Sequence, residues 1–370
     1  MTAVLVHDWL TGMRGGERVL EVLCELLPEA DLLTLVSVPG RVSPAIAAHR
    51  IRPSLIQHLP WVSRLYRHYL PLFPFAIEQF DLDAADLVVS SSHCAAKAVV
   101  CRPGARHLCY CFTPMRYAWD QFDHYFGAGR LGRLGAAAAR PVMASLARWD
   151  RGTAGRVDRY VAISHYVAGR IRRYYNRASD VVYPPVDTEF FQPDGRRPDG
   201  YLLIVSALVP YKRIDLAVQA ATVAGLPLRV VGEGPERARL QRLAADAPVE
   251  FLGRQTDEQI RTLYRGALAV VLPGEEDFGI VPVEAQACGR PVVALARGGA
   301  LETVRDGVTG VLVPEPTAEA FAEAFGSLRG RWFNQDVIRA HAESFSRARF
   351  ARQMQQMIEQ TVQAPEGTRW

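Results

Sequence analysis

The chain has 370 residues, of which 49% are hydrophobic and 22% are charged, an ordinary globular composition on a chain long enough for two domains. The formal net charge is +4, and the whole basic excess falls in residues 1–195, which carry 22 Lys and Arg against 18 Asp and Glu. No run of 18 apolar residues occurs and the first residues do not resemble a signal peptide, which excludes a membrane-spanning chain and predicts a cytoplasmic protein. The six cysteines are scattered, which predicts reduced thiols and no metal site.

The first predicted unit, residues 4–20, is a strand followed by a glycine-bearing loop and an amphipathic helix. Gly15 and Gly16 would open this helix, and its unpaired N–H groups would face the carboxyl edge of the sheet, where they can attract a phosphate. A simple tight turn explains the same two glycines, so this pair alone is weak evidence for a ligand.

Two segments of the N-terminal half are rich in basic residues. Residues 50–80 interleave Arg with Trp, Tyr, Phe and Pro, which suits a surface that touches anionic headgroups and acyl chains, or alternatively a pair of helices packed on the core. Residues 130–177 hold eleven Arg and two acidic residues, which favours a face turned towards anionic lipid or a lipid diphosphate, or a solvated basic helix. Neither segment contains a recognised nucleic-acid module, so no nucleic-acid partner is expected.

Two further predicted strands end in polar residues. The strand that starts near residue 86 runs into a Ser-Ser-Ser-His sequence ending at His93, and the strand that starts at residue 107 runs into a loop with Thr113 and Arg116. Because parallel strands end at one edge of a sheet, we expect these three side chains to line a substrate site there.

A second domain is predicted after the polar segment Asp194–Gly200, which reads as a linker between domains at residues 1–190 and 195–340. Its first strand covers residues 201–208, and Lys212 lies in the loop that follows. The chain uses arginine almost everywhere and has only one other lysine, and a compact ammonium in a strand-to-helix loop suits a diphosphate. Arg213 is the expected second cation.

A glycine loop follows the next predicted strand, and we expect its Gly232 and Glu233 to lie beneath a nucleoside. The most informative segment is residues 267–299. An apolar run at 267–272 predicts a buried parallel strand, and a polar loop then leads to a helix with Pro282 at its first position and Gly289 just past its end.

The loop after this strand has the features of a sugar-nucleotide site. Backbone N–H groups at the start of the helix can attract a phosphate or a sugar, and glycine permits close approach. Glu276 in the loop and Glu284 in the helix can accept hydrogen bonds from different hydroxyls of one ligand. A βαβ unit with a solvated acidic loop would show the same two carboxylates. The other expected ligand-binding positions of this segment are Asp277, Phe278, Gly279, Ile280 and Val281.

The order of residues in this segment resembles that of the retaining glycosyltransferases of family 4. The shared pattern is Glu276-x7-Glu284 with Phe278-Gly279 inside it, then Ala285-x-Ala287-Cys288-Gly289 and Gly298-Gly299-x-x-Glu302. The resemblance implies an α/β fold of the GT-B type, with two Rossmann-like domains whose parallel sheets face a central cleft. It also implies that a C-terminal helix at about 345–370 packs back on the first domain.

The resemblance further implies roles for individual residues. Lys212 and Arg213 would stabilise the charge of the leaving nucleotide diphosphate, as would the turn at Gly15–Gly16. Glu276 would orient the sugar hydroxyls and Glu284 would bind the ribose hydroxyls. No metal ion or other cofactor is required in enzymes of this type.

The segments around His93 and Thr113 resemble a subgroup of family 4 that adds mannose to polyprenyl-diphosphate-linked saccharides. This resemblance implies GDP-mannose as the donor and a lipid-linked saccharide as the acceptor. It also implies work at the inner face of the cytoplasmic membrane, with peripheral contact to anionic lipid. The process would be the synthesis of a bacterial surface polysaccharide such as lipopolysaccharide or exopolysaccharide.

The chain departs from the pattern at two places. Phe112 stands where the subgroup has a histidine before Thr-Pro, and His93 or His124 is a possible substitute. Ser206-Ala207 stands where the family has Gly-Arg on the diphosphate, so Ser206 is the substrate-binding candidate there. These departures keep two alternatives open, a family 4 transferase with a UDP-sugar donor and a catalytically weak sugar-nucleotide-binding protein.

Overall fold

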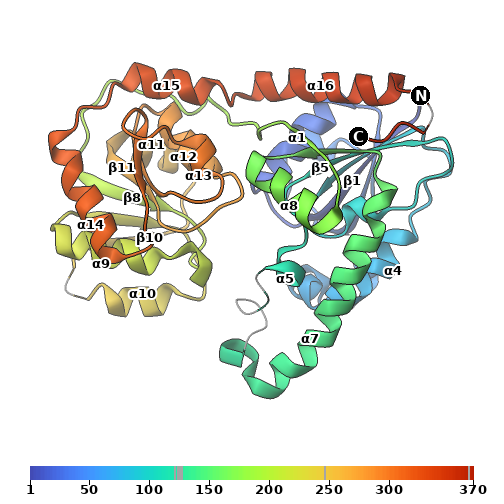
Figure 1. Ribbon diagram of the computed structural model, residues 1–370, viewed down its shortest axis with the longest axis horizontal. Helices are drawn as coiled ribbons and strands as arrows, with labels where there is room; N and C mark the ends of the chain where they lie inside the picture. The colour runs from blue at the N-terminus through green and yellow to red at the C-terminus, as the bar shows by residue number, and fades with distance from the viewer. Residues whose placement is uncertain (121, 123–127, 246, 366) are drawn as a thin grey trace. The chain divides into compact units, whose positions relative to one another are not determined.

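The computed structural model describes residues 1–370 except residues 121, 123–127, 246 and 366. The chain divides into two compact units. Unit 1 comprises Met1–Pro185 and Ala348–Trp370, and unit 2 comprises Val186–Arg347. Each unit has its own parallel sheet with helices packed around it (Figure 1).

The sheet of unit 1 has seven strands in the order β3-β2-β1-β4-β5-β6-β7, and every pair is parallel. Its strands are β1 (Ala3–Leu10), β2 (Asp31–Ser37), β3 (Ile51–Pro53), β4 (Leu87–Ser92), β5 (Arg106–Cys111), β6 (Arg159–Ala162) and β7 (Asp180–Val181). The central strands are buried along almost their whole length, as expected for a parallel sheet covered on both faces, and several of the buried residues are polar. The strand order reverses at β1 and β4, and ligands bind outside the carboxyl ends of such neighbouring strands.

The helices of unit 1 are α1 (Gly15–Leu26), α2 (Pro44–Ala47), α3 (Val62–Leu65), α4 (Phe73–Glu78), α5 (Arg116–Trp119), α7 (Ala128–Gly152), α8 (His165–Tyr175) and α16 (Arg347–Gln363). Its 3₁₀ helices are η1 (Leu55–His58), η2 (Tyr66–Leu72), η3 (Ala96–Ala98) and η4 (Thr153–Arg156). Helix α16 packs on the sheet of unit 1 through Phe350, whose ring centroid lies 5.4 Å from that of Tyr110 on β5. Among the described residues, none of the helices combines the length and the apolar character needed to cross a bilayer.

Residues 50–80 form one short strand and a series of short helical turns, so the alternative of two packed helices is wrong in detail. The segment divides its aromatic residues between core and solvent. Tyr66, Leu70 and Phe73 are buried against Trp9 and its neighbours. Several large apolar side chains remain exposed instead, namely Leu55, Trp61, Leu65, Leu72 and Phe75.

The arginine-rich stretch of residues 130–177 does not form a single basic face. Arg159 is 4% exposed and pairs with Asp180 at 2.7 Å, and Arg156 pairs with Glu78 at 2.7 Å. Six arginines on α7 and α8 are exposed, namely Arg133, Arg140, Arg148, Arg151, Arg172 and Arg173. The stretch therefore combines structural ion pairs, made with acidic residues far away in the sequence, with solvated positions.

Lys97, the other lysine of the chain, lies in the core of unit 1 with a side chain 1% exposed. Its Nζ lies 3.1 Å from the fully buried Asp150 carboxylate and donates to the Asp150 carbonyl and to Thr153. Asp150 also accepts hydrogen bonds from Trp119 Nε1 and from the Tyr175 hydroxyl. The pair links η3 to α7 and α8.

Unit 2 has a six-stranded parallel sheet in the order β10-β9-β8-β11-β12-β13, the order of a dinucleotide-binding fold, with its reversal at β8 and β11. Its strands are β8 (Tyr201–Val205), β9 (Leu228–Val231), β10 (Val249–Gly253), β11 (Ala267–Leu272), β12 (Val292–Leu295) and β13 (Gly310–Val313). Its helices are α9 (Ile214–Ala224), α10 (Arg237–Leu243), α11 (Asp257–Gly266), α12 (Ile280–Ala287), α13 (Ala300–Thr303), α14 (Ala318–Ser327) and α15 (Gln335–Glu343), with the 3₁₀ helices η5 (Pro210–Lys212) and η6 (Leu328–Gly330).

Two boundaries in unit 2 differ from those expected. Pro282 is the third residue of α12 and not the first, because the helix begins at Ile280 with Gly279 as its N-cap. The amides of the whole first turn lack intrahelical partners, so proline is tolerated there as well. The segment Asp194–Gly200 already belongs to unit 2, where the Arg196 carbonyl accepts a hydrogen bond from Arg290 at 2.7 Å.

Candidate active site

In unit 2, the predicted ligand-binding residues gather in loops at the carboxyl ends of β8 and β11. The loop after β8 leads through η5 to Lys212, and the loop after β11 leads through Glu276 to the start of α12. The two loops touch at Gly274, where a Cβ atom would lie 2.8 Å from the Lys212 Cα. Glycine is therefore required for the approach that places Lys212 beside Glu276.

Lys212 and Glu276 form an ion pair between Nζ and Oε1, and their side chains are only 16% and 19% exposed. The neighbouring Arg213 has a left-handed backbone, with φ of +50°, as the N-cap of α9. Its guanidinium lies 3.3 Å from Asp215 and does not join the pair. The structure therefore joins two of the three predicted catalytic residues, Lys212 and Glu276. The third, Arg213, follows Lys212 directly in the sequence but pairs with Asp215 instead.

The loop of Glu276 is fixed by a second glycine contact. Gly298 and Gly299 follow β12, and the N–H of Gly299 donates to the Glu276 carbonyl at 2.8 Å. A Cβ at Gly298 would lie 2.3 Å from that carbonyl oxygen. The Gly-Gly pair thus allows one loop to brace the backbone of the other, which holds the Glu276 side chain at the edge of the sheet.

The start of α12 offers backbone groups more than side chains. Phe278 is 2% exposed and packs against Phe345, with ring centroids 5.7 Å apart, and Asp277 is 7% exposed. Gly279, with φ of +88°, turns the chain into the helix, so the N–H groups of Ile280 and Val281 lie in its first turn. Such a helix start attracts anions.

Glu284 lies one turn further along α12 and accepts a hydrogen bond from the Tyr264 hydroxyl at 2.9 Å. Burial raises the pKa of Tyr264 well above its usual range, and the Glu284 carboxylate raises it further. The hydroxyl therefore stays protonated and donates to Glu284. Nothing in the sequence pattern indicated Tyr264 as a support for this carboxylate.

The loop after β9 lies close to the loop after β8. Gly232, with φ of +129°, is so near the Ser206 carbonyl that a Cβ would lie 1.9 Å from its oxygen. The Ser206 hydroxyl donates to the Ala207 carbonyl at 3.3 Å. Glu233 faces Arg237 at 2.5 Å and is half exposed. The structure thus brings Ser206 and Gly232 together, while the carboxylate of Glu233 is paired with Arg237, the first residue of α10.

In unit 1, the corresponding edge lies at the carboxyl ends of β1 and β4. Gly15 and Gly16 open α1 as predicted, and the Arg14 N–H donates to the Glu17 carboxylate at 3.0 Å. A Cβ at Gly16 would lie 3.6 Å from the rings of His7 and Phe112. The start of α1 therefore lies in van der Waals range of these two rings, at a distance that would also admit a Cβ atom.

His93 is the first residue after β4, and its Nδ1 lies 3.0 Å from Oδ2 of Asp8 on β1. Asp8 is fully buried and accepts four backbone hydrogen bonds of 2.6–3.0 Å, from the N–H groups of residues 93–96. Burial alone would raise the pKa of Asp8, but the charge of His93 and the hydrogen bonds from its ring and backbone lower it to about 2. Asp8 is not among the predicted site residues, although an acidic residue inside an otherwise apolar strand was a signal for it.

The loop after β5 carries Phe112 and Thr113 and leads to Arg116. The Phe112 ring lies 6.1 Å from that of His93 and 6.4 Å, edge to face, from that of His7. Thr113 is 6% exposed, and its Oγ1 has no hydrogen-bond partner among the described residues. Arg116 is the first residue of α5. His124, the other possible substitute for the missing histidine, lies outside the described residues.

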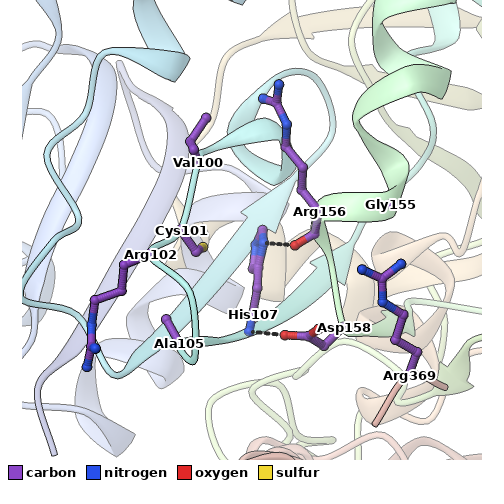
Figure 2. Close-up of a pocket in the computed structure, with 9 residues that line it drawn as sticks. All are labelled: Val100, Cys101, Arg102, Ala105, His107, Gly155, Arg156, Asp158 and Arg369. Atoms are coloured by element: carbon purple, nitrogen blue, oxygen red, sulfur yellow. Dashed lines mark hydrogen bonds between the residues drawn. The ribbon is translucent and has the colours of Figure 1, made fainter. Parts of the chain in front are cut away.

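A cavity of about 190 Å³ lies at the opposite, amino edge of the sheet of unit 1, where β5 and β6 begin (Figure 2). His107 spans its wall and is bonded to Asp158 and to the Arg156 carbonyl. Arg102 and Arg156, which also line the cavity, pair with Asp86 and with Glu78, respectively. These charges are already matched, so the cavity is not part of the candidate site.

Two family models match the chain. Residues 13–190 match "Glycosyltransferase Family 4" and residues 186–329 match "Glycosyl transferases group 1". A D-inositol 3-phosphate glycosyltransferase of Mycobacteroides abscessus is 39% identical over 192 residues, which are 45% of this chain and 43% of that protein. The protein of the same name from Mycobacterium tuberculosis is 36% identical over 196 residues, 45% of this chain and 40% of that one. The matches thus span less than half the length of these relatives.

Solved structures resemble the whole chain. HepE of Anabaena, solved in complex with UDP, is 17% identical with a TM-score of 0.68 and covers 98% of this chain and 99% of its own. Sucrose-phosphate synthase of Thermosynechococcus elongatus is 20% identical with a TM-score of 0.69 and covers 97% and 99%. At these identities the likeness establishes the fold, and the predicted GT-B class is confirmed. The two adjoining matches, to the family 4 and group 1 glycosyltransferase models, together cover residues 13–329, and both units have the Rossmann-like sheet of the GT-B fold.

Proposed function

We propose that the protein transfers a sugar from a nucleotide-sugar donor to a hydroxyl of an acceptor, with retention of anomeric configuration. The observation that carries this proposal is the Lys212–Glu276 pair, which lies beside the start of α12 where the order of the second sheet reverses. A cation and a helix start suit a diphosphate, and a carboxylate suits sugar hydroxyls.

The chemistry asked of these groups is electrostatic. When the bond between the sugar and the diphosphate breaks, negative charge grows on the leaving phosphate oxygen. Lys212, Arg213 and the amides at the start of α12 would stabilise that charge before and during cleavage. Because Lys212 contacts Glu276, a bound diphosphate must share or replace this contact, which couples donor binding to the orientation of the carboxylate.

For the donor and acceptor we propose GDP-mannose and a polyprenyl-diphosphate-linked saccharide, on the resemblance of the segments around His93 and Thr113. The second candidate is a UDP-sugar donor with an inositol phosphate acceptor. It is favoured by the names of the two mycobacterial relatives and by the UDP bound to HepE.

Transfer assays with radiolabelled GDP-mannose, UDP-glucose and UDP-N-acetylglucosamine separate these candidates. Each donor is incubated with bacterial lipid extract or with D-inositol 3-phosphate. Label from GDP-mannose in the lipid fraction supports the first proposal, and label from a UDP-sugar on inositol phosphate supports the second. Binding of a nucleotide sugar without transfer to either acceptor would instead indicate a binding protein.

Glu276→Gln tests the role of the carboxylate within the same assay. We expect transfer to fall by about a hundredfold or more, the loss typical of a group that acts on the transition state, while calorimetry shows nucleotide binding largely retained. Glu275→Gln, at an exposed neighbouring position, is the matched control. Full turnover by the Glu276 variant would remove this residue from the site.

We further propose peripheral contact between unit 1 and anionic membranes. Trp61 and Phe75 are 72% and 58% exposed, and Arg64 and Arg67 lie between them in the sequence and are exposed. Aromatic and basic side chains on one surface segment suit the headgroup region. Sedimentation with phosphatidylglycerol vesicles, but not with phosphatidylcholine vesicles, is expected. Trp61→Ser with Phe75→Ser should abolish it, and sedimentation unchanged in this variant would refute the contact.

A further inference from the structure

The ring of His93 is held on several sides at the carboxyl edge of unit 1. Its Nδ1 lies 3.0 Å from Asp8 Oδ2, and Trp9 meets it edge to face with centroids 4.3 Å apart at 87°. Phe112 approaches from the next strand at 6.1 Å. The side chain is nevertheless 29% exposed, while that of Asp8 is fully buried. One edge of the imidazole therefore faces a buried carboxylate, and the ring reaches solvent.

This arrangement defines the tautomer of the neutral ring. An ionised carboxylate only accepts hydrogen bonds, so Asp8 accepts from Nδ1–H of His93. The lone pair then lies on Nε2, on the other edge of the ring, where it can accept a hydrogen bond from a ligand. The four backbone N–H groups that donate to Asp8 favour its ionised form whether or not the ring is charged.

Asp8 does not need the ring to satisfy its own hydrogen-bonding capacity. Its two oxygens already accept four backbone N–H groups, two on each oxygen. The contact with the ring is therefore not needed to satisfy Asp8. It does fix the orientation of the His93 ring and keeps the proton on Nδ1. A carboxylate that orients an imidazole in this way is a recurrent device for preparing its second nitrogen.

We propose that His93, oriented by Asp8, binds the sugar substrate by accepting a hydrogen bond at Nε2 from one of its hydroxyls. The proposal rests on the proposed function and deepens it, because it assigns a sugar contact to the edge of unit 1 where the strand order reverses. His93 is then a substrate-binding residue and Asp8 is a positioning residue. The unpartnered hydroxyl of Thr113, 6% exposed on the loop after Phe112, supplies a second polar group at the same edge.

Protonation of His93 would abolish this acceptor. The titratable groups that face the ring are Asp8 and His7 from β1 and Glu17 from α1. Burial lowers the pKa of His7 to about 4, and burial raises the pKa of Glu17. His7 is therefore neutral at neutral pH and adds no positive charge beside the ring.

The kinetic test compares His93→Phe, which keeps an aromatic ring against Trp9 but has no acceptor, with wild type. We expect kcat/KM to fall about tenfold or more, as for one lost hydrogen bond. A raised KM for the acceptor assigns the hydroxyl to the acceptor, and a raised KM for the donor assigns it to the transferred sugar. Asp8→Asn, which removes the carboxylate that orients the ring, should raise the same KM to a smaller extent. His68→Gln, at an exposed histidine of unit 1, should leave the kinetics unchanged.

A second measurement does not depend on turnover. In protein with ¹⁵N-labelled histidine, the His93 signals, identified by their loss in His93→Phe, should show Nδ1–H in wild type and shift when GDP-mannose or methyl α-mannoside is added. If ligand shifts the His93 signals but no transfer is detected, the proposed function is refuted and the sugar contact is retained. Unchanged His93 signals with both ligands, or wild-type kcat/KM in His93→Phe, would overturn the inference.

Discussion

Acidification should destabilise unit 1 through two buried histidines. His7 and His107 are 1% and 0% exposed, and burial lowers the pKa of each to about 4 in the folded chain. His7 hydrogen-bonds Ser91 at 2.8 Å, and His107 hydrogen-bonds Ser90 at 2.8 Å on the same strand. Neither ring is accessible to water, so folding requires both to be neutral.

The direction and the magnitude of this change in stability follow from the linkage between folding and proton binding. The unfolded chain binds a proton near pH 6.5 and the folded chain only near pH 4, so unfolding takes up protons between these values and stability is lost as the pH falls. Between these pH values, each histidine lowers the free energy of unfolding by about 1.4 kcal/mol for each pH unit of acidification, or by about 3 kcal/mol in total. Above pH 6.5 none of this stability is lost. Glu17 acts with the opposite sign, because burial raises its pKa.

Tryptophan fluorescence can isolate this effect. Five of the six tryptophans belong to unit 1, and the sixth, Trp332, is 83% exposed, so Trp332→Phe confines the signal to unit 1. Urea unfolding of this variant from pH 7 to pH 5 should show a steep loss of stability. Adding His107→Gln should reduce the slope by about 1.4 kcal/mol per pH unit, whatever its cost at pH 7. Adding His68→Gln should not, and equal slopes with and without His107 would refute the reasoning.

Three substitutions extend the test to other parts of the chain. Lys97→Met leaves the buried Asp150 carboxylate without its cation and should cost about 3–5 kcal/mol in urea unfolding, and an unshifted midpoint would contradict this. Tyr264→Phe removes the hydrogen bond to Glu284 and should weaken nucleotide-diphosphate binding about tenfold in calorimetry, whereas wild-type affinity would show that Glu284 needs no such support. Gly299→Ala places a Cβ 2.3–2.6 Å from backbone atoms of the facing loop and should cost about 1–3 kcal/mol, measured by thermal unfolding against an exposed Gly326→Ala control.

Much of the fold follows from local patterns in the sequence. The six apolar residues Ala267–Leu272 are strand β11, and Gly289 lies just past α12 with φ of +74°. The structure of residues 50–80 was not predictable, because some aromatic residues of this segment lie in the core and others in solvent. Which of them are buried depends on packing against residues distant in the sequence. The segment Asp194–Gly200 has a linker composition, yet it is held by Arg290 and other groups distant in the sequence.

The candidate site likewise contains residues that were predictable from the sequence and contacts that were not. The residues at the start of α12 were predictable because glycine, proline and apolar runs identify a strand, a loop and a helix start. The contact between Lys212 and Glu276 was not, because it depends on the neighbouring positions of β8 and β11 in the sheet. The partners of Asp8 were not predictable for the same reason, because residues 93–96 follow a different strand. The ion pairs of the arginine-rich stretch likewise cannot be predicted from a local count of charge.

The two points at which the chain passes between the units are hydrogen-bonded to each other. Val186 pairs with Ser346 in an isolated parallel bridge, with backbone bonds of 3.0 Å and 3.1 Å to Phe345 and Arg347. Unit 2 is therefore a continuous insertion whose ends meet, and unit 1 is a discontinuous domain interrupted once. During synthesis, unit 1 lacks α16 until every residue of unit 2 has been made. Unit 2 can complete its sheet first, and the final helix then completes unit 1.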